Sequence, residues 1–171
     1  MKLYIVSDTH MGMRSGSQEW LKMTNDWFND DFIPEIKKTF EPGDQLVHVG
    51  DVFDNRQSIS VPVQHATIDI FEKLSKIFFE CSGQNSIHIL LGNHDVWKTT
   101  TNEITSVDCL KYIPGVKIYK EPEIVQFSDI KFLIMPWRAS IDEERQCIEQ
   151  FKKEKPSYIF CHADVKNMLT D

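Results

Sequence analysis

Apolar residues are distributed along the chain in two patterns that alternate. Short runs of strand-forming residues, typified by KLYIV near the start, are separated by longer segments whose apolar residues recur three and four positions apart. The first pattern is typical of buried β-strands and the second of amphipathic helices. The strand-like runs are residues 2–6, 45–49, 86–91, 116–119, 123–127, 131–135 and 157–160. The helical segments are residues 20–40, 62–78, 104–110 and 141–154.

This order of elements predicts an α/β fold. Strands that alternate with helices of ten or more residues form β-α-β units, and such units assemble into layers with helices flanking the sheet. The sequence contains no repeat, low-complexity tract or linker, so we expect one domain over residues 1–171. In folds of this class, ligands bind beyond the carboxyl ends of the strands.

Polar residues directly follow four of the predicted strands. The sequences at these points are SDTH, GDVFD, GNHD and CHAD. Because the carboxyl ends of such strands share one edge of a sheet, we expect the four clusters to converge there. The chemically informative residues in them are Asp8, His10, Gly50, Asp51, Asp54, Gly92, Asn93, His94, Asp95 and His162.

These side chains suit a divalent metal of hard-to-borderline character, such as manganese, iron or zinc, because they are carboxylates, imidazoles and an amide oxygen. Asp8 and His10 are two residues apart, and in an extended segment their side chains point the same way. Asp51 follows Gly50, which permits a sharp turn. Its carboxylate is therefore the natural candidate to bridge two ions.

Each cluster by itself has a simpler interpretation. Strands often end in polar residues, and Gly, Asn and Asp favour ordinary turns. The four clusters together, each at a strand end, favour a metal site over four unrelated turns. The remaining histidines, His48, His65 and His88, lie inside strand or helix patterns, so we interpret them as structural.

Composition narrows the class of protein without identifying its partner. A hydrophobic content of 41% and a charged content of 26% are ordinary for a soluble globular protein, and no segment approaches the length of a membrane span. The four cysteines form no C-x-x-C pair, which favours reduced thiols in a cytoplasm-like compartment. The net charge of −7 argues against a protein that coats nucleic acid, although bound divalent cations would reverse the charge locally.

The motifs D-x-H, G-D-x-x-D and G-N-H-D, followed by a later histidine, resemble those of the calcineurin-like metallophosphoesterase superfamily over essentially the whole chain. The stretches GDVFDNR and IMPW are also similar to SbcD-type DNA nuclease subunits and their phage counterparts. The superfamily resemblance implies a layered metallophosphoesterase fold and two divalent ions, with Mn²⁺ as the expected metal. It also implies a division of the ligands, with Asp8 and His10 on one ion, Asn93 and His162 on the other, and Asp51 on both.

The resemblance further implies that activated water attacks phosphorus in line with the leaving oxygen. His94 is the expected general acid, and Asp95 is expected to orient or charge it. Arg14 and Arg56 are candidates for substrate binding through the phosphate backbone, with solvated surface arginines as the alternative interpretation. The apolar stripe from Val63 to Phe78 is either core or the face of a homodimer.

The chain departs from the family pattern in two places. Cys161 stands where the family has glycine, and no histidine follows His162, although the family pattern ends in a further G-H-x-H. We therefore expect a C-terminally truncated domain, a piece of a longer protein whose final motif and partner-binding region are absent. A split or truncated gene and a site that is incomplete by nature are the alternatives.

Three functions remain open at this point. The first is a metal-dependent phosphodiester hydrolase, the exo- or endonuclease subunit of a DNA repair, recombination or replication complex. In this interpretation the chain binds DNA and an SbcC-type coiled-coil ATPase, forms a homodimer and works in the cytoplasm, or in the host cytoplasm for a phage-like protein. The second is a phosphodiesterase or phosphatase for small substrates. The third is a non-catalytic scaffold that binds proteins.

Overall fold

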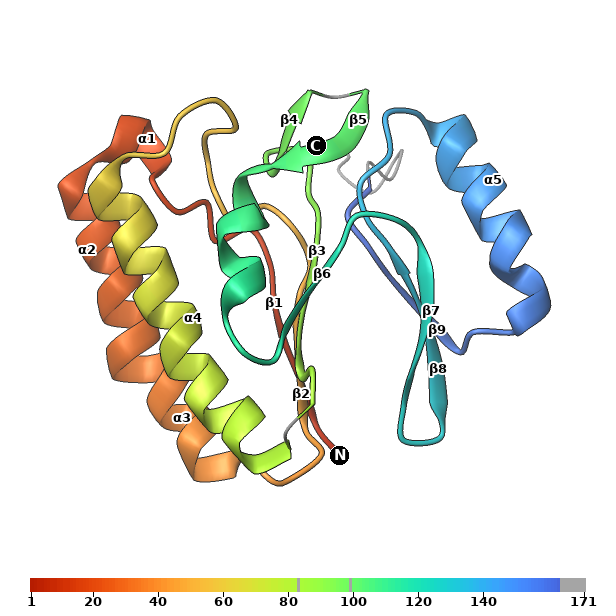
Figure 1. Cartoon of the computed structure of the whole chain (residues 1–171), viewed down its shortest axis with the longest axis horizontal. Helices are drawn as coiled ribbons and strands as arrows, with labels where there is room; N and C mark the ends of the chain where they lie inside the picture. The colour runs from red at the N-terminus through yellow and green to blue at the C-terminus, as the bar shows by residue number, and fades with distance from the viewer. Residues whose placement is uncertain (83, 99, 164–171) are drawn as a thin grey trace, which may run out of the picture.

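The computed structural model describes residues 1–82, 84–98 and 100–163. These residues form four layers, with helices outside and two β-sheets between them (Figure 1). The layered α/β fold predicted from the sequence is confirmed. Within the described residues, no helix is long and apolar enough to cross a membrane.

A four-stranded sheet of parallel strands forms the centre of the molecule, in the order β1-β2-β3-β6. Every neighbouring pair in this sheet runs parallel. The carboxyl ends of these strands therefore lie at one edge, as the polar clusters required. The strands are β1 (Leu3–Val6), β2 (Gln45–His48), β3 (Ile87–Leu90) and β6 (Val116–Tyr119).

Helices cover one face of this sheet (Figure 1). The segment predicted as one helix over residues 20–40 is a helical run of three parts, because a π-helical turn divides it. The later helix begins with Pro62 in its first turn, where its missing N–H costs nothing. The elements are α1 (Met13–Gly16), α2 (Gln18–Asp26), the π-helix (Trp27–Phe32), α3 (Ile33–Thr39) and α4 (Val61–Ser82).

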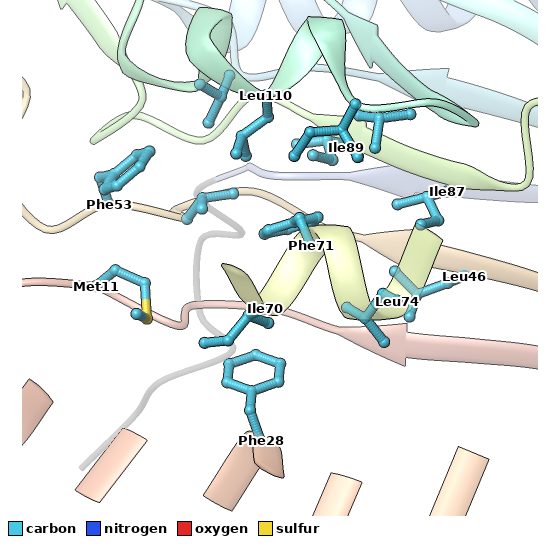
Figure 2. Packing of buried hydrophobic residues seen from close by; sticks show 14 of the residues in the cluster. Met11, Phe28, Leu46, Phe53, Ile70, Phe71, Leu74, Ile87, Ile89 and Leu110 are labelled. Atoms are coloured by element: carbon cyan, nitrogen blue, oxygen red, sulfur yellow. The ribbon is translucent and has the colours of Figure 1, made fainter. Parts of the chain in front are cut away.

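The main hydrophobic core lies between α4 and the parallel sheet. Figure 2 shows Ile70, Phe71 and Leu74 of α4 in the same cluster as Leu46 of β2 and Ile87 of β3. The stripe along α4 is therefore core, one of the two interpretations that the sequence left open. The buried members of the stripe are Val63, Ala66, Ile70, Leu74 and Phe78.

A second sheet packs on the other face of the parallel sheet, with α5 (Ile141–Phe151) outside it (Figure 1). Its order is β7-β8-β9, antiparallel between the first two strands and parallel between the last two. Val47 of β2 packs against Phe127 and Phe132 between the sheets. The strands are β7 (Glu123–Phe127), β8 (Ile130–Met135) and β9 (Tyr158–Cys161), and a 3₁₀ turn (Lys152–Glu154) follows α5.

The helix predicted over residues 104–110 is wrong at its start. Residues before it form an antiparallel hairpin of β4 (Val96–Lys98) and β5 (Thr101–Thr105), and Ile104 belongs to β5. A 3₁₀ helix (Ser106–Tyr112) follows, and Thr105 and Asp108 form a capping box that fixes its first residue. The hairpin escaped prediction because its strands are short and mostly exposed, so they lack a buried apolar run.

Two histidines are buried inside the parallel sheet, in line with their structural interpretation. His48 shares a hydrogen bond of 3.0 Å with the Thr9 hydroxyl. His88 lies between the Tyr119 hydroxyl at 2.7 Å and Gln45 Oε1 at 2.9 Å. Burial lowers the pKa of His48 to about 3 and that of His88 to about 4. Both imidazoles are therefore neutral in the folded chain at neutral pH.

This neutrality predicts a loss of stability in mild acid. An unfolded chain protonates histidine near pH 6.5, whereas the folded chain resists protonation of His48 and His88, so stability present above pH 6.5 is lost as the pH falls toward 4. Between pH 7 and pH 5, each histidine lowers the free energy of unfolding by about 2 kcal/mol. Urea denaturation in the presence of a chelator measures this loss.

In the variant His88→Gln the amide supplies a hydrogen-bond donor and acceptor but does not titrate. Its free energy of unfolding should therefore fall between pH 7 and pH 5 by about 2 kcal/mol less than that of the wild type. His65→Gln, at an exposed position of α4, is the matched histidine-to-glutamine control. Equal pH dependence in wild type and His88→Gln would contradict the prediction.

Candidate metal centre

The loops after β1 and β2 are joined by backbone hydrogen bonds that continue the strand pairing past the strand ends. The N–H of Asp8 donates to the carbonyl of Gly50 at 3.0 Å, and the N–H of His10 donates to the carbonyl of Asp51 at 3.0 Å. The two loops therefore run side by side across the carboxyl edge of the sheet, and each is fixed by the other.

The Asp8–His10 segment is not extended, contrary to the sequence-based expectation. Asp8 and His10 have φ values of 54° and 40°, and Asp51 has φ 56°, all in the left-handed region that non-glycine residues rarely adopt. The turn still brings the first pair together, with His10 Nε2 3.8 Å from Asp8 Oδ1. Three strained residues at one edge of the sheet indicate a site whose geometry is fixed by its surroundings.

Asp95 provides much of that fixation. Its carboxylate is fully buried and accepts hydrogen bonds from four backbone N–H groups. The donors are Gly92 at 2.9 Å, Asp51 at 2.8 Å, Val52 at 3.0 Å and Phe53 at 3.3 Å. Burial raises the pKa of the carboxyl to about 6. Asp95 thus ties the loop after β3 to the loop after β2.

This arrangement corrects the role expected for Asp95, because its described hydrogen bonds go to the backbone and not to His94. The ring Nδ1 of His94 instead donates to the backbone carbonyl of Asp54 at 2.6 Å. Asp54 also places its carboxylate 3.3 Å from His10 Nδ1, a buried ring atom without a hydrogen bond of good geometry. Asp54 is therefore the positioning residue that contacts both histidines. In the sequence, Asp54 is the second aspartate of the GDVFD motif, and its place in that motif is the feature that could have predicted this role.

Two glycines permit the close approach of the three loops. A Cβ atom on Gly92 would lie 2.1 Å from Asp51 Oδ1 and 2.4 Å from the Asp51 backbone nitrogen, distances that no side chain tolerates. A Cβ atom on Gly50 would lie 2.6 Å from His162 Nδ1, and its φ of +92° also favours glycine.

Asp51 stands at the centre of the converging side chains. It is buried, its Oδ1 accepts the backbone N–H of His94 at 2.8 Å, and its Oδ2 lies 3.6 Å from His10 Nε2 and 3.5 Å from His162 Nε2. Two groups of three side chains each have their potential ligand atoms within 4.8 Å of one another, and Asp51 belongs to both groups. The groups are His10, Asp51 and His94, and Asp8, Asp51 and His162.

His162 reaches the centre from the second sheet, at the end of β9. The expectation of one shared sheet edge is therefore corrected for this cluster, because the edges of two packed sheets meet here. Its Nδ1–H donates to the carbonyl of Val49 at 2.9 Å. The other ring nitrogen, Nε2, then lies 3.0 Å from Asn93 Oδ1. Asn93 and His162 are thus adjacent, as their expected shared role requires.

The donor set fits divalent metal ions. Carboxylate oxygens and imidazole nitrogens are ligands for manganese, iron and zinc, and a carboxylate common to both groups is suited to bridge two ions. The His and Asp groups are consistent with a dinuclear metal site. The structure groups Asp8 with His162, and His10 with His94. The family resemblance instead pairs Asp8 with His10, whose side chains lie 3.8 Å apart, so the contacts are compatible with either division of the ligands between two ions.

The two arginines expected to bind substrate lie outside these groups. Arg14 is exposed, and its guanidinium carbon lies 4.7 Å from the centroid of the Trp20 ring. This cation–π contact accounts for the position of the side chain. Arg56 lines a hollow together with Trp97. Their roles in substrate binding stay predictions.

Comparison with known proteins decides the family. The sequence profile of the calcineurin-like phosphoesterases matches residues 1–169. The chain belongs to this family. The expected truncation of the domain, with the final G-H-x-H motif absent, concerns sequence beyond residue 163, which lies outside the described residues, and it stays a prediction. No curated protein matches the chain.

Among solved structures, the phosphoesterase chain is similar to a crystal structure of a protein of unknown function from Aquifex aeolicus. The identity is 19%, the TM-score is 0.51, and the match covers 96% of this chain and 81% of that one. At this identity the likeness concerns the fold alone. Within that fold, the family membership makes this chain a metal-dependent phosphoesterase by class.

The role of Asp95 predicts a large effect of a small substitution. Asp95→Asn replaces a carboxylate that accepts four N–H bonds by an amide with one acceptor oxygen and two donors, which leaves buried N–H groups unpaired. The free energy of unfolding should fall by about 3 kcal/mol, measured by urea denaturation without metal. Asp129→Asn, at an exposed turn, is the control and should change stability by less than about 0.5 kcal/mol. Equal stability of the two variants would assign Asp95 a minor role.

Proposed function

We propose that this chain hydrolyses phosphodiester bonds with two bound divalent ions and acts as the nuclease subunit of a DNA repair or recombination complex. The observation that carries the proposal is the position of Asp51, whose carboxylate belongs to both groups of ligand atoms and also accepts the backbone N–H of His94. A carboxylate common to two donor groups, with an imidazole beside it, would suit phosphoryl hydrolysis assisted by two metal ions.

Asp8, His10, Asp51, Asn93 and His162 would hold the ions, with Asp51 shared. When bound, such ions stabilise negative charge on the phosphoryl group and activate water for attack on phosphorus. Asp95 and the two glycines fix the loops that carry these donors. Mn²⁺ is the proposed metal, in agreement with the oxygen and nitrogen donor set.

His94 is the proposed proton donor to the leaving oxygen. Its Nδ1–H donates to the carbonyl of Asp54, which fixes the ring and leaves Nε2 as the nitrogen available for proton transfer. The ring packs edge-on against His10, with 4.9 Å between centroids, so rotation is further restricted. The imidazole therefore stands beside the donor groups with its second nitrogen unbound by the backbone.

The nuclease assignment is supported by the resemblance of GDVFDNR and IMPW to SbcD-type subunits. It brings with it DNA as substrate and a coiled-coil ATPase as partner. A phosphodiesterase for small substrates is the second candidate, and the net charge of −7 is the observation that favours it, because a long polyanion is repelled by an acidic chain.

Metal titration tests the two-ion proposal. Calorimetric titration with Mn²⁺ should give two ions per chain, and Asp51→Asn should weaken both binding events because its carboxylate belongs to both groups. Asp129→Asn, an exposed carboxylate remote in sequence from the donors, should leave the stoichiometry unchanged. One ion or none would contradict the proposal and favour a non-catalytic scaffold.

His94→Ala separates proton transfer from metal binding. If His94 donates the proton, the variant keeps the Mn²⁺ stoichiometry while kcat for a DNA oligonucleotide falls by about 100-fold or more. The paired measurements are calorimetry and gel-based strand cleavage. Loss of an ion in the variant would make His94 a metal ligand, and an unchanged kcat would remove it from the mechanism.

A further inference from the structure

A hollow of about 350 Å³ lies between the segment after Asp54 and the β4–β5 hairpin. It is distinct from the groups of metal-binding side chains, since none of its lining residues belongs to them. The lining residues that bear on its chemistry are Arg56, Gln57, Ile59, Trp97, Ile104 and Ser106.

Both walls of the hollow are attached to residues of the metal centre. Arg56 is two residues after Asp54, whose carbonyl holds the His94 ring. Trp97 is three residues after His94, so their Cα atoms are at most about 11 Å apart. The hollow is therefore lined by the same two chain segments that carry Asp54 and His94 of the metal centre.

The hollow has an unusual apolar wall for a surface beside a polar centre. Trp97 is 46% exposed and Ile104 is 58% exposed, although both are large hydrophobic side chains that gain free energy by burial. Trp97 lines the hollow from β4, and Ile104 lines it from β5. A flat apolar ligand that covers the Trp97 ring would bury this surface.

The charges around the hollow favour a phosphate-bearing ligand. Arg56 contributes a guanidinium to the lining, and the ammonium of Lys98 lies 4.8 Å from the centroid of the Trp97 ring. None of the described residues that line the hollow is acidic, in contrast to the net charge of −7 for the whole chain. Arg56 is the one cation in the described lining, and the Lys98 ammonium lies over one face of the Trp97 ring. Cationic side chains beside an exposed aromatic ring are the combination with which proteins bind single-stranded nucleic acids.

We propose that this hollow binds the nucleobase next to the scissile phosphate of a single-stranded nucleic acid. The base stacks on Trp97 and contacts Ile104, while Arg56 pairs with the adjoining phosphate. The inference rests on the proposed phosphodiesterase function, and it makes the substrate a nucleic-acid strand with an unpaired base at the site. Trp97 is a substrate-binding residue that sets preference among phosphodiesters.

Fluorescence anisotropy of a labelled ten-residue oligothymidylate, with chelator present to prevent cleavage, measures the contribution of Trp97. Trp97→Ala should weaken binding about tenfold, the effect expected when one base loses its stacking partner. Trp97→Phe keeps an aromatic ring and should bind within about threefold of wild type. It should also lose the quenching of tryptophan emission that the oligonucleotide causes in the wild-type protein.

Tyr112→Ala is the matched control. Tyr112 is 79% exposed with the Lys111 ammonium 5.0 Å from its ring centroid, so it repeats the lysine–aromatic pair of the hairpin outside the hollow. This variant should bind the oligothymidylate like wild type. With Mn²⁺ present, Trp97→Ala should also lower kcat/KM for the oligonucleotide about tenfold relative to that for bis(p-nitrophenyl) phosphate.

The outcomes separate this inference from the proposed function. Wild-type binding and cleavage of the oligonucleotide, with unchanged affinity in Trp97→Ala, would overturn the base-binding hollow and leave the nuclease proposal standing. A wild-type protein that hydrolyses bis(p-nitrophenyl) phosphate but neither binds nor cuts the oligonucleotide would overturn both. A tenfold weakening in Trp97→Ala, together with wild-type affinity in Tyr112→Ala, supports the inference.

Discussion

One buried carboxylate holds the candidate centre together. Asp95 accepts N–H bonds from residues on both sides of the gap between the β2 and β3 loops, and in doing so it satisfies backbone donors that would otherwise be buried without partners. Asp51 is one of these donors, so its left-handed backbone is stabilised through the same carboxylate. The backbone that carries the central Asp51 side chain is thus held by the Asp95 carboxylate.

The sequence predicted the architecture well because that architecture follows from periodicity. Buried parallel strands are continuous apolar runs, and amphipathic helices repeat every three to four residues, so both are legible without a structure. The same logic pointed to side chains that the structure brings close together. Polar clusters that follow four predicted strands in succession are harder to explain as unrelated turns than any one of them, and Asp8, Asp51, Asn93 and His162 were proposed as ligands on that basis.

The features that escaped prediction depend on directions and distances between segments remote in sequence. His94 and Asp95 are neighbours in the chain, but their side chains have different partners. The His94 imidazole donates to the Asp54 carbonyl, whereas the Asp95 carboxylate accepts backbone N–H groups. The left-handed φ of Asp8 is likewise imposed by its partner loop and has no local signature. Which sheet would carry His162 depended on the packing of β9, and that packing is a tertiary property.

The anchoring of His162 couples the centre to the mechanical integrity of the sandwich. This imidazole belongs to the second sheet but hydrogen-bonds to Val49 at the edge of the first. A ligand that binds Asp51 and His162 together would link the two sheets, because separation of the sheets would pull the two residues apart. By thermodynamic linkage, such a ligand at 100 times its Kd would oppose that separation by about 2.7 kcal/mol. Ligand binding at the centre and cohesion between the two sheets are thus thermodynamically coupled.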